Sequence, residues 1–160
     1  MKAFIQRHDI PFNGLFKSYW NNGQLDLMGM LDKDGKRIGL WTEWYETGQK
    51  KLEVTYKDGI KEGLFNGWNV NGQLRYEWGY KDGKRVDGIS KGWYPDGNLK
   101  QTMSWKNDKQ NGLHTEWREN GQKRYEKTYK NGKQDGLETR WYKNGQKSYE
   151  VTYKDGNLIK

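Results

Sequence analysis

The 160-residue chain contains no cysteine, and it has only two prolines and two histidines. Without cysteine it has no disulfide framework, thiol nucleophile or thiolate metal site. The N-terminus lacks the apolar stretch of a signal peptide, and no segment is apolar over transmembrane length. We therefore expect a cytoplasmic protein, and nothing in the sequence calls for a metal or a cofactor.

Aliphatic residues are also scarce. Hydrophobic residues make up 32% of the chain and charged residues 31%, which is little apolar material for a two-sided core. Nine tryptophans and eleven tyrosines supply large apolar surfaces instead. Because these rings pack as flat bodies with a polar edge, the composition predicts a sheet with one aromatic face.

Glycines recur at a fixed spacing. A unit of 24 to 25 residues repeats six times, and its first glycine is Gly14, Gly39, Gly63, Gly88, Gly112 and Gly136. A second glycine marks a turn at Gly23, Gly48, Gly72, Gly97, Gly121 and Gly145, and a third turn carries glycine in every unit except at Asp108. Such a period predicts tandem repeats that pack on their neighbours, here as one domain of residues 14–160.

Two places carry one extra residue, within 28–34 and within 85–87. We expect a bulge or a widened turn at each.

The turn Tyr94-Pro95-Asp96-Gly97-Asn98 predicts a three-residue hairpin loop with a glycine in the left-handed conformation. A two-residue Asn-Gly loop is the alternative, but it would split the apolar residues between two faces. The three-residue loop pairs Trp44 with Lys50, Glu43 with Lys51, Thr42 with Leu52, Trp41 with Glu53 and Leu40 with Val54. It also pairs Ser18 with Asp26 and Glu116 with Arg124.

This register places Leu40, Trp44, Leu52, Val54 and Tyr56 on one face of the sheet. Each repeat then supplies two strands, such as residues 40–45 and 49–56. The predicted fold is all-β: an open antiparallel β-hairpin repeat array, forming a twisted single-layer meander of about a dozen strands. Two aromatic columns should form its core: Trp44, Trp68, Trp93, Trp117 and Trp141, and Tyr56, Tyr80, Trp105, Tyr129 and Tyr153.

The two ends of an open array need protection. Residues 1–13, with Phe4, Ile5, Ile10 and Phe12, are expected to cap the first repeat. An exposed edge strand at the other end could accept a partner strand or a second copy of the chain.

The sequence does not favour catalysis. His8 and His114 are far apart and have no metal-ligand spacing around them. The acids Glu53, Glu77, Glu126 and Glu150 recur with the repeat, which is typical of a solvated ladder of charge. We therefore predict that the chain is not an enzyme and has no catalytic, cofactor-binding or metal-binding residues.

One column varies between repeats. It holds Phe16, Trp41, Phe65, Ser90, His114 and Glu138, and such variety indicates a solvent-exposed face where specificity resides. Rings on a polar sheet face are candidate contacts for a partner. The predicted partner-binding residues are Trp41, Tyr45, Phe65, Tyr94, His114 and Tyr142.

The net charge is +8, from 29 basic and 21 acidic residues, and many lysines lie at turns. Lysines there keep sheet edges soluble. They could also attract phospholipid head groups or nucleic acid, which is the alternative function.

The pattern Gly-Leu-x-x-x-Trp-Tyr-x-x-Gly-Gln-x-x-x-x-x-x-Tyr-Lys-x-Gly, read from Gly136 to Gly156, resembles the MORN variant repeat of bacterial proteins, which include a YwqK-type family described as antitoxins. The resemblance covers residues 14–160. Tyr19 replaces the tryptophan in the first unit, and the fourth lacks the third glycine. The resemblance implies a protein-binding scaffold with a toxin as its partner, that is, an antitoxin or immunity protein, and it carries over no catalytic residue.

Overall fold

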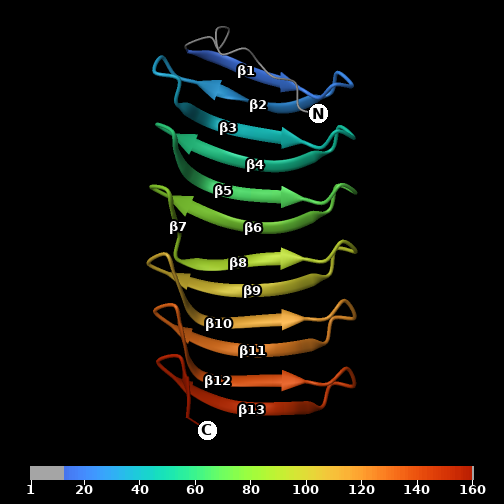
Figure 1. Cartoon of the computed structure of the whole chain (residues 1–160), viewed down its shortest axis with the longest axis vertical. Helices are drawn as coiled ribbons and strands as arrows, with labels where there is room; N and C mark the ends of the chain where they lie inside the picture. Colours follow the sequence, from blue (N-terminus) through green and yellow to red (C-terminus); the bar gives the residue numbers. More distant parts are fainter. Residues whose placement is uncertain (1–12, 160) are drawn as a thin grey trace. The chain divides into compact units, whose positions relative to one another are not determined.

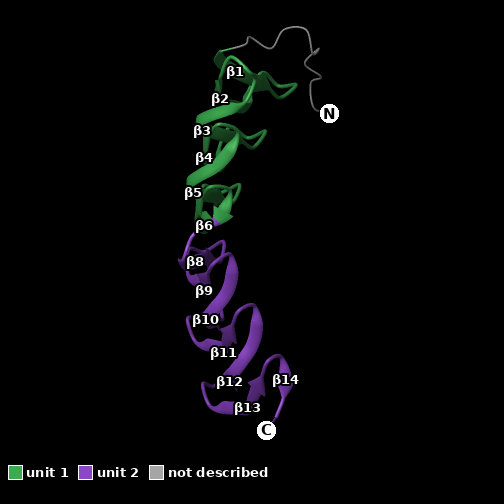
Figure 2. Ribbon diagram, turned by 90° about the vertical axis from the view of Figure 1, so that its left-hand side faces the viewer, with its two compact units in different colours: residues 1–84 green, residues 85–160 purple. Residues whose placement is uncertain are grey.

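The computed structural model describes residues 13–159, in which fourteen strands and no helix are found. The predicted cap, including Phe4, Ile5, Ile10 and Phe12, lies outside the described residues except for Asn13. The chain divides into two compact units, Met1–Lys84 and Arg85–Lys160 (Figure 2). The division falls at the second predicted insertion, residues 85–87.

Unit 1 is an open antiparallel sheet in which each strand pairs with the next strand along the chain (Figure 1). Its strands are β1 (Gly14–Tyr19), β2 (Leu25–Leu31), β3 (Arg37–Trp44), β4 (Lys50–Lys57), β5 (Ile60–Trp68) and β6 (Leu74–Lys81).

Unit 2 repeats the same arrangement, with the two-residue β7 (Lys84–Arg85) at the division between the units. Its other strands are β8 (Gly88–Trp93), β9 (Leu99–Lys106), β10 (Lys109–Trp117), β11 (Lys123–Lys130), β12 (Lys133–Trp141), β13 (Lys147–Lys154) and β14 (Asn157–Leu158). The predicted fold class, an antiparallel β-hairpin repeat array, is confirmed.

The predicted three-residue loops are present. The Tyr45 amide donates to the Gln49 carbonyl at 2.8 Å, and the Gly48 amide donates to the Tyr45 carbonyl at 2.9 Å. The turns that join the repeats are tighter. In the Asp58-Gly59 turn both residues have positive φ, 51° and 82°, as a two-residue hairpin loop requires. The first insertion widens one of these turns, where the Asp32 amide donates to the Lys36 carbonyl at 2.9 Å.

A β-bulge follows each three-residue loop and changes the predicted register. Trp44 lies opposite Lys50 as predicted, but the next pair is Glu43 with Leu52. Trp41 therefore lies opposite Val54 and Leu40 opposite Thr55, so the predicted pairs Trp41–Glu53, Leu40–Val54 and Thr42–Leu52 are wrong. The same bulge makes the predicted pairs Glu43–Lys51, Ser18–Asp26 and Glu116–Arg124 wrong, because the observed partners are Leu52, Leu27 and Tyr125. The extra residue in the bulge moves every later pair by one position. As a result, the β3 side chains that were predicted to face the core lie on the opposite face of the sheet, and their neighbours take their place.

The exchange decides which residues form the core of unit 1. Trp41 is 2% exposed and packs with Val54 and Leu31, and Phe16, Leu27, Tyr56 and Phe65 lie against this cluster. Leu40, predicted to share the core face, is 53% exposed. The two predicted aromatic columns are half-buried.

The Trp41 indole can pack closely against β2 because residue 29 of that strand is a glycine. A Cβ on Gly29 would lie 2.2 Å from the Trp41 indole, so any side chain there would collide with the ring. The indole Nε1 donates to the Met30 carbonyl at 3.2 Å, and the Arg37 guanidinium lies 4.2 Å from the ring centroid. These contacts hold the largest core side chain of unit 1 flat against the sheet.

Candidate functional site

The variable column faces inward. Trp41, Ser90 and Glu138 are buried, and Phe65 and His114 are half-buried. The interpretation of this column as a solvent-exposed face is therefore wrong, because the bulge turns it toward the buried side. The use of Trp41, Phe65 or His114 by a partner stays a prediction.

The chemistry of this column differs between the units. In unit 1 it is aromatic, and Phe65 stacks on Trp78 at 4.7 Å and on Tyr76 at 5.7 Å between ring centroids. In unit 2 it holds the polar residues Ser90, His114 and Glu138.

Tyr45 and Tyr94 belong to a column that links successive hairpins. The Tyr45 hydroxyl donates to the Trp68 carbonyl at 2.8 Å, and the Tyr94 hydroxyl donates to the Trp117 carbonyl at 2.7 Å. Arg118 makes the same link to the Trp141 carbonyl at 2.7 Å. These three residues therefore have a structural role, whereas Tyr142, at the same position of the last repeat, is 58% exposed.

Three of the repeated glutamates are paired with lysines. Lys123 contacts Glu126 at 2.6 Å and Lys147 contacts Glu150 at 2.6 Å, and Lys50 forms the equivalent pair with Glu53. Three members of the predicted ladder of charge thus form ion pairs between residues three positions apart, whereas Leu74 stands at the equivalent position before Glu77.

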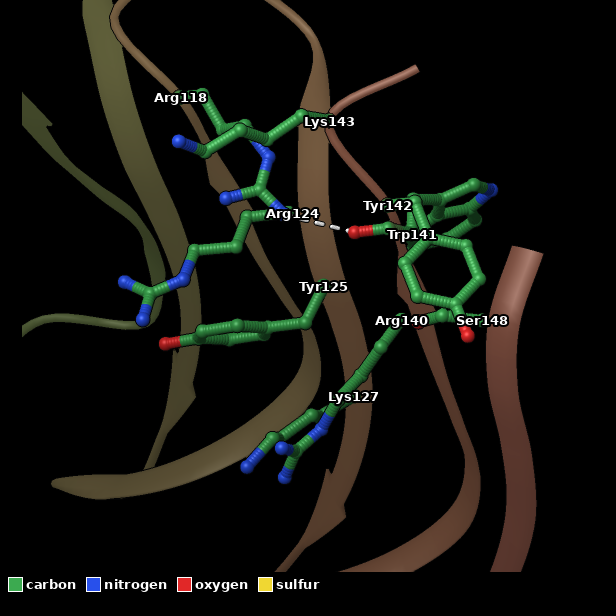
Figure 3. A pocket seen from close by; sticks show the side chains of 9 residues that line it. All are labelled: Arg118, Arg124, Tyr125, Lys127, Arg140, Trp141, Tyr142, Lys143 and Ser148. Carbon is green, nitrogen blue, oxygen red and sulfur yellow. Dashed lines mark hydrogen bonds between the residues drawn. The ribbon is translucent and has the colours of Figure 1, made fainter. Parts of the chain in front are cut away.

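A hollow of about 450 Å³ opens in unit 2. The residues that line it belong to β11, β12 and β13 and to the turns that follow β10 and β12 (Figure 3). It is lined by Arg118, Arg124, Tyr125, Lys127, Arg140, Trp141, Tyr142, Lys143 and Ser148. Five of these nine residues are cationic and none is acidic.

A second hollow of about 380 Å³ shares Arg118, Arg124 and Lys143 with the first. Its other lining residues are Tyr94, Glu119 and Asn120. We call the two hollows together the cationic groove. Two predicted partner-binding residues, Tyr94 and Tyr142, border it.

The β-bulge shapes the groove. Arg124 is the extra residue between the pairs Trp117–Lys123 and Glu116–Tyr125, and Ser148 is the extra residue of the next hairpin. Both line the first hollow, and in Figure 3 the Tyr125 ring lies between the Arg124 guanidinium and the ends of Lys127 and Arg140.

Two glutamates hold three of the cations in place. Glu116 contacts Arg124 at 2.6 Å, although its strand partner is Tyr125. Glu138 contacts Arg140 at 2.6 Å and Lys127 at 3.7 Å, and it accepts a hydrogen bond from Gln134 at 2.7 Å.

The buried carboxylate of Glu138 is kept charged. Burial acts to raise the pKa of Glu138, but the hydrogen bonds from Gln134 and Arg140 and the charge of Lys127 outweigh it, so the pKa is lowered. Burial, with a contribution from Glu116, raises the pKa of Tyr125 above its ordinary value. Both groups therefore keep their usual protonation states at neutral pH.

Arg118 and Lys143 form no ion pair with any residue in 13–159. The Arg118 Nε is buried and has no hydrogen-bond partner among these residues. The groove therefore carries more positive than negative charge, which suits an anionic group.

His114 lies beneath the groove rather than in it. Its ring packs edge-on against Tyr125 at 5.2 Å, and its Nε2 lies 3.4 Å from the Tyr125 hydroxyl. Burial lowers the pKa of His114. Within the described residues, no group of three or more His, Cys, Asp or Glu side chains is arranged to hold a metal ion.

The sequence analysis missed the five cations of the groove. Arg118 stands where other repeats have an aromatic residue or asparagine, and Arg140 stands where the second and fifth repeats have glutamate. These departures from the repeat are visible in the sequence. The approach of the basic side chains to one another in space depends on the bulge, which the sequence pattern does not show.

Taken together, the hairpin array and its groove define a tandem-repeat binding scaffold. The family model of the MORN repeat variant matches residues 12–29, 37–58, 86–107, 110–131 and 134–155, more than half of the chain. The chain belongs to this family, whose repeats are generally modules that bind proteins or membranes. A comparison with curated proteins finds no match.

The repeat formed by β5 and β6 is outside the matched segments, yet it has the same hairpin and the same bulge as the others. No helix in residues 13–159 is long and apolar enough to cross a membrane.

Proposed function

We propose that this chain is a non-enzymatic scaffold that binds another protein. The observation that carries this proposal is a row of exposed aliphatic side chains, one at the same position of every repeat and each 45 to 62% exposed. The row consists of Leu15, Leu40 and Leu64 in unit 1, and of Ile89, Leu113 and Leu137 in unit 2.

The row lies on the face of the sheet opposite to the core, because Leu40 and the buried Trp41 are consecutive in β3. In unit 1 Leu15 lies directly opposite Met30, which is also exposed, so two apolar side chains meet across the strands. A single exposed leucine is ordinary, but a row repeated in register is typical of an interaction surface.

Within this function we propose the role of an antitoxin or immunity protein, which neutralises a toxin by binding it. The resemblance to YwqK-type repeats supports this role. The partner to test is the product of the neighbouring gene.

The test measures binding of that product to the purified chain by calorimetry and growth of cells that express both proteins. Leu64→Ser should weaken binding at least tenfold and abolish protection. Val70→Ser is the matched control, because Val70 is as exposed as Leu64 but lies in a turn outside the row. Equal affinities of the two variants, with unchanged melting temperatures, would exclude the row as the binding surface.

The runner-up function is binding to anionic phospholipid or nucleic acid, which the net charge of +8 favours. Binding to phosphatidylserine vesicles or to DNA at low salt, together with no affinity for the toxin, would replace the first proposal with this one.

A further inference from the structure

We infer that the cationic groove of unit 2 binds an acidic segment of a protein partner. The inference rests on the proposed protein-binding function, because it takes the occupant to be a protein. It adds the place of contact and the chemistry of the bound segment.

The charge of the groove is the first argument. Arg118, Arg124, Lys127, Arg140 and Lys143 line the first hollow, and Glu116 and Glu138 contact only Arg124, Lys127 and Arg140 among them. Arg118 and Lys143 remain without an acidic partner among the described residues, and both lie where the two hollows meet. A carboxylate placed there would gain charge-assisted hydrogen bonds from two sides.

The shape of the groove is the second argument. Its two hollows, about 450 and 380 Å³, are each of the size that encloses a small group rather than a helix or a duplex. The first hollow is free of acids, whereas Glu119 and Asn120 line the second. An extended segment would thus place its carboxylate in the first hollow and an uncharged neighbour in the second.

The exposed ring of Tyr142 completes the site. It is one of the residues that line the first hollow (Figure 3). Unlike Tyr94, it does not bond a neighbouring hairpin in the described structure, so its ring can pack against the aliphatic stem of a bound glutamate.

Nucleic acid fits this groove less well. Bases bind single-strand sites by stacking on free aromatic faces. Here the Lys127 ammonium lies 5.0 Å from the centroid of Tyr125 and the Lys123 ammonium lies 5.5 Å from that of Trp141, so both rings already have a cation over them. The five positive charges of the groove are also offset by the three negative charges of Glu116, Glu119 and Glu138, which leaves charge for about two carboxylates rather than for a run of phosphates.

A membrane surface fits less well because the free cations line a hollow. Head groups on a flat bilayer would meet the exposed Lys143 at the rim but would not reach the cations on the walls of the hollow.

The experiment uses the full chain and a fluorescent octaglutamate peptide, with octaglutamine as the uncharged comparison, and measures anisotropy at low salt. Octaglutamate should bind and octaglutamine should not. Lys143→Glu should weaken binding at least tenfold, and Lys143→Arg should leave it within about twofold, because the charge is kept.

Lys133→Glu is the matched control, since Lys133 is an exposed lysine at the other end of β12 and the change in net charge is the same. The inference predicts less than a twofold effect for this variant. Equal losses for Lys133→Glu and Lys143→Glu would show a diffuse charge effect and overturn the site, as would no binding of octaglutamate.

Two further probes test the class of ligand. A 20-nucleotide single-stranded DNA and phosphatidylserine vesicles should bind more weakly than octaglutamate and be insensitive to Lys143→Glu. Tighter binding of either probe, lost in Lys143→Glu, would overturn the assignment to a protein segment.

The outcomes for the site and for the proposed function are distinguishable. If Leu64→Ser disrupts the toxin complex and Lys143→Glu leaves both the complex and octaglutamate binding unchanged, the groove inference fails and the scaffold function stands. If octaglutamate binds at Lys143 and no toxin is bound, the antitoxin role fails alone.

Discussion

At the scale of single residues, Leu40 and Trp41 are consecutive in β3 but have opposite environments. Trp41 is almost completely buried, whereas half of the Leu40 surface is exposed. Their difference follows from the alternation of side chains along a strand, so each serves as the control for the other.

Trp41→Ala is expected to lower the free energy of unfolding by about 3 to 5 kcal/mol, the usual cost of removing a buried large aromatic side chain. Leu40→Ala should change it by less than about 0.5 kcal/mol, because an exposed side chain loses few contacts. Urea denaturation of both variants measures the difference. A loss at position 40 as large as at position 41 would contradict the observed register.

Gly29→Ala tests the close contact beneath Trp41. The added methyl group would meet the indole at 2.2 Å and should destabilise unit 1 by about 1 to 3 kcal/mol through overpacking. In the Trp41→Ala background the same change should cost much less, since the ring is gone. A double-mutant cycle measures this coupling, and additive effects would exclude the contact.

Glu138 predicts a pH dependence. Its pKa is lowered in the folded state, so its stabilisation is present above the ordinary glutamate pKa and is lost as the pH falls through the lowered value. Glu138→Gln should cost about 1 to 2 kcal/mol at neutral pH, because the cations it contacts remain partly hydrated. The difference from the unmodified chain should shrink at acid pH.

Chemical denaturation at about pH 7 and about pH 3 checks this expectation, on either side of the ordinary glutamate pKa. Glu119→Gln, at an exposed position, is the control and should show no such change. A cost of Glu138→Gln that stays constant with pH would contradict the role of its charge.

At the scale of elements, successive hairpins are joined by side-chain hydrogen bonds as well as by their strands. The hydroxyl of Tyr94, just after β8, donates to the carbonyl of Trp117 at the end of β10. The same position uses Tyr45 in unit 1 and Arg118 further along unit 2, so the link tolerates different donors.

Tyr94→Phe removes only the donor and should lower stability by about 1 kcal/mol, the net value of a typical hydrogen bond. Tyr142→Phe makes the same change at the exposed copy and should be neutral. Thermal unfolding of the two variants is the measurement. Equal shifts would mean that the link to Trp117 contributes nothing.

At the scale of the whole molecule, strands in each unit contact chiefly their neighbours in sequence. Stability in such an array is a sum of hairpin terms and nearest-neighbour terms, so a local defect should stay local. Trp41→Ala should therefore accelerate amide hydrogen exchange most in β2 to β5 and least in β11 to β13. Exchange that rises equally in all strands would instead indicate one cooperative unit.

Much of the fold was predictable. The glycine columns located every turn, and the three-residue loop at Tyr94 to Asn98 indicated hairpins in the correct places. Glu43 and Glu116 do contact Lys51 and Arg124, but their strand partners are Leu52 and Tyr125, because Lys51 and Arg124 are the extra residues of the bulges. The first insertion, expected to be a bulge or a widened turn, is a widened turn.

The candidate site was less accessible to prediction. Tyr94 and Tyr142 were selected for their rings, and they do border the groove. Trp41, Phe65 and His114 were selected from a column that proved to face inward. Arg118 and Lys143 were overlooked, since a lone basic residue in a basic chain is not conspicuous.

The sequence by itself determined the repeat, the turns and the antiparallel order, because these depend on local φ preferences and on the period of glycine and aromatic residues. Only the tertiary structure decided which face is buried and where the positive charge gathers. Both depend on the bulge after each loop, a single additional residue that leaves the sequence pattern almost unchanged while it exchanges the two faces of the sheet.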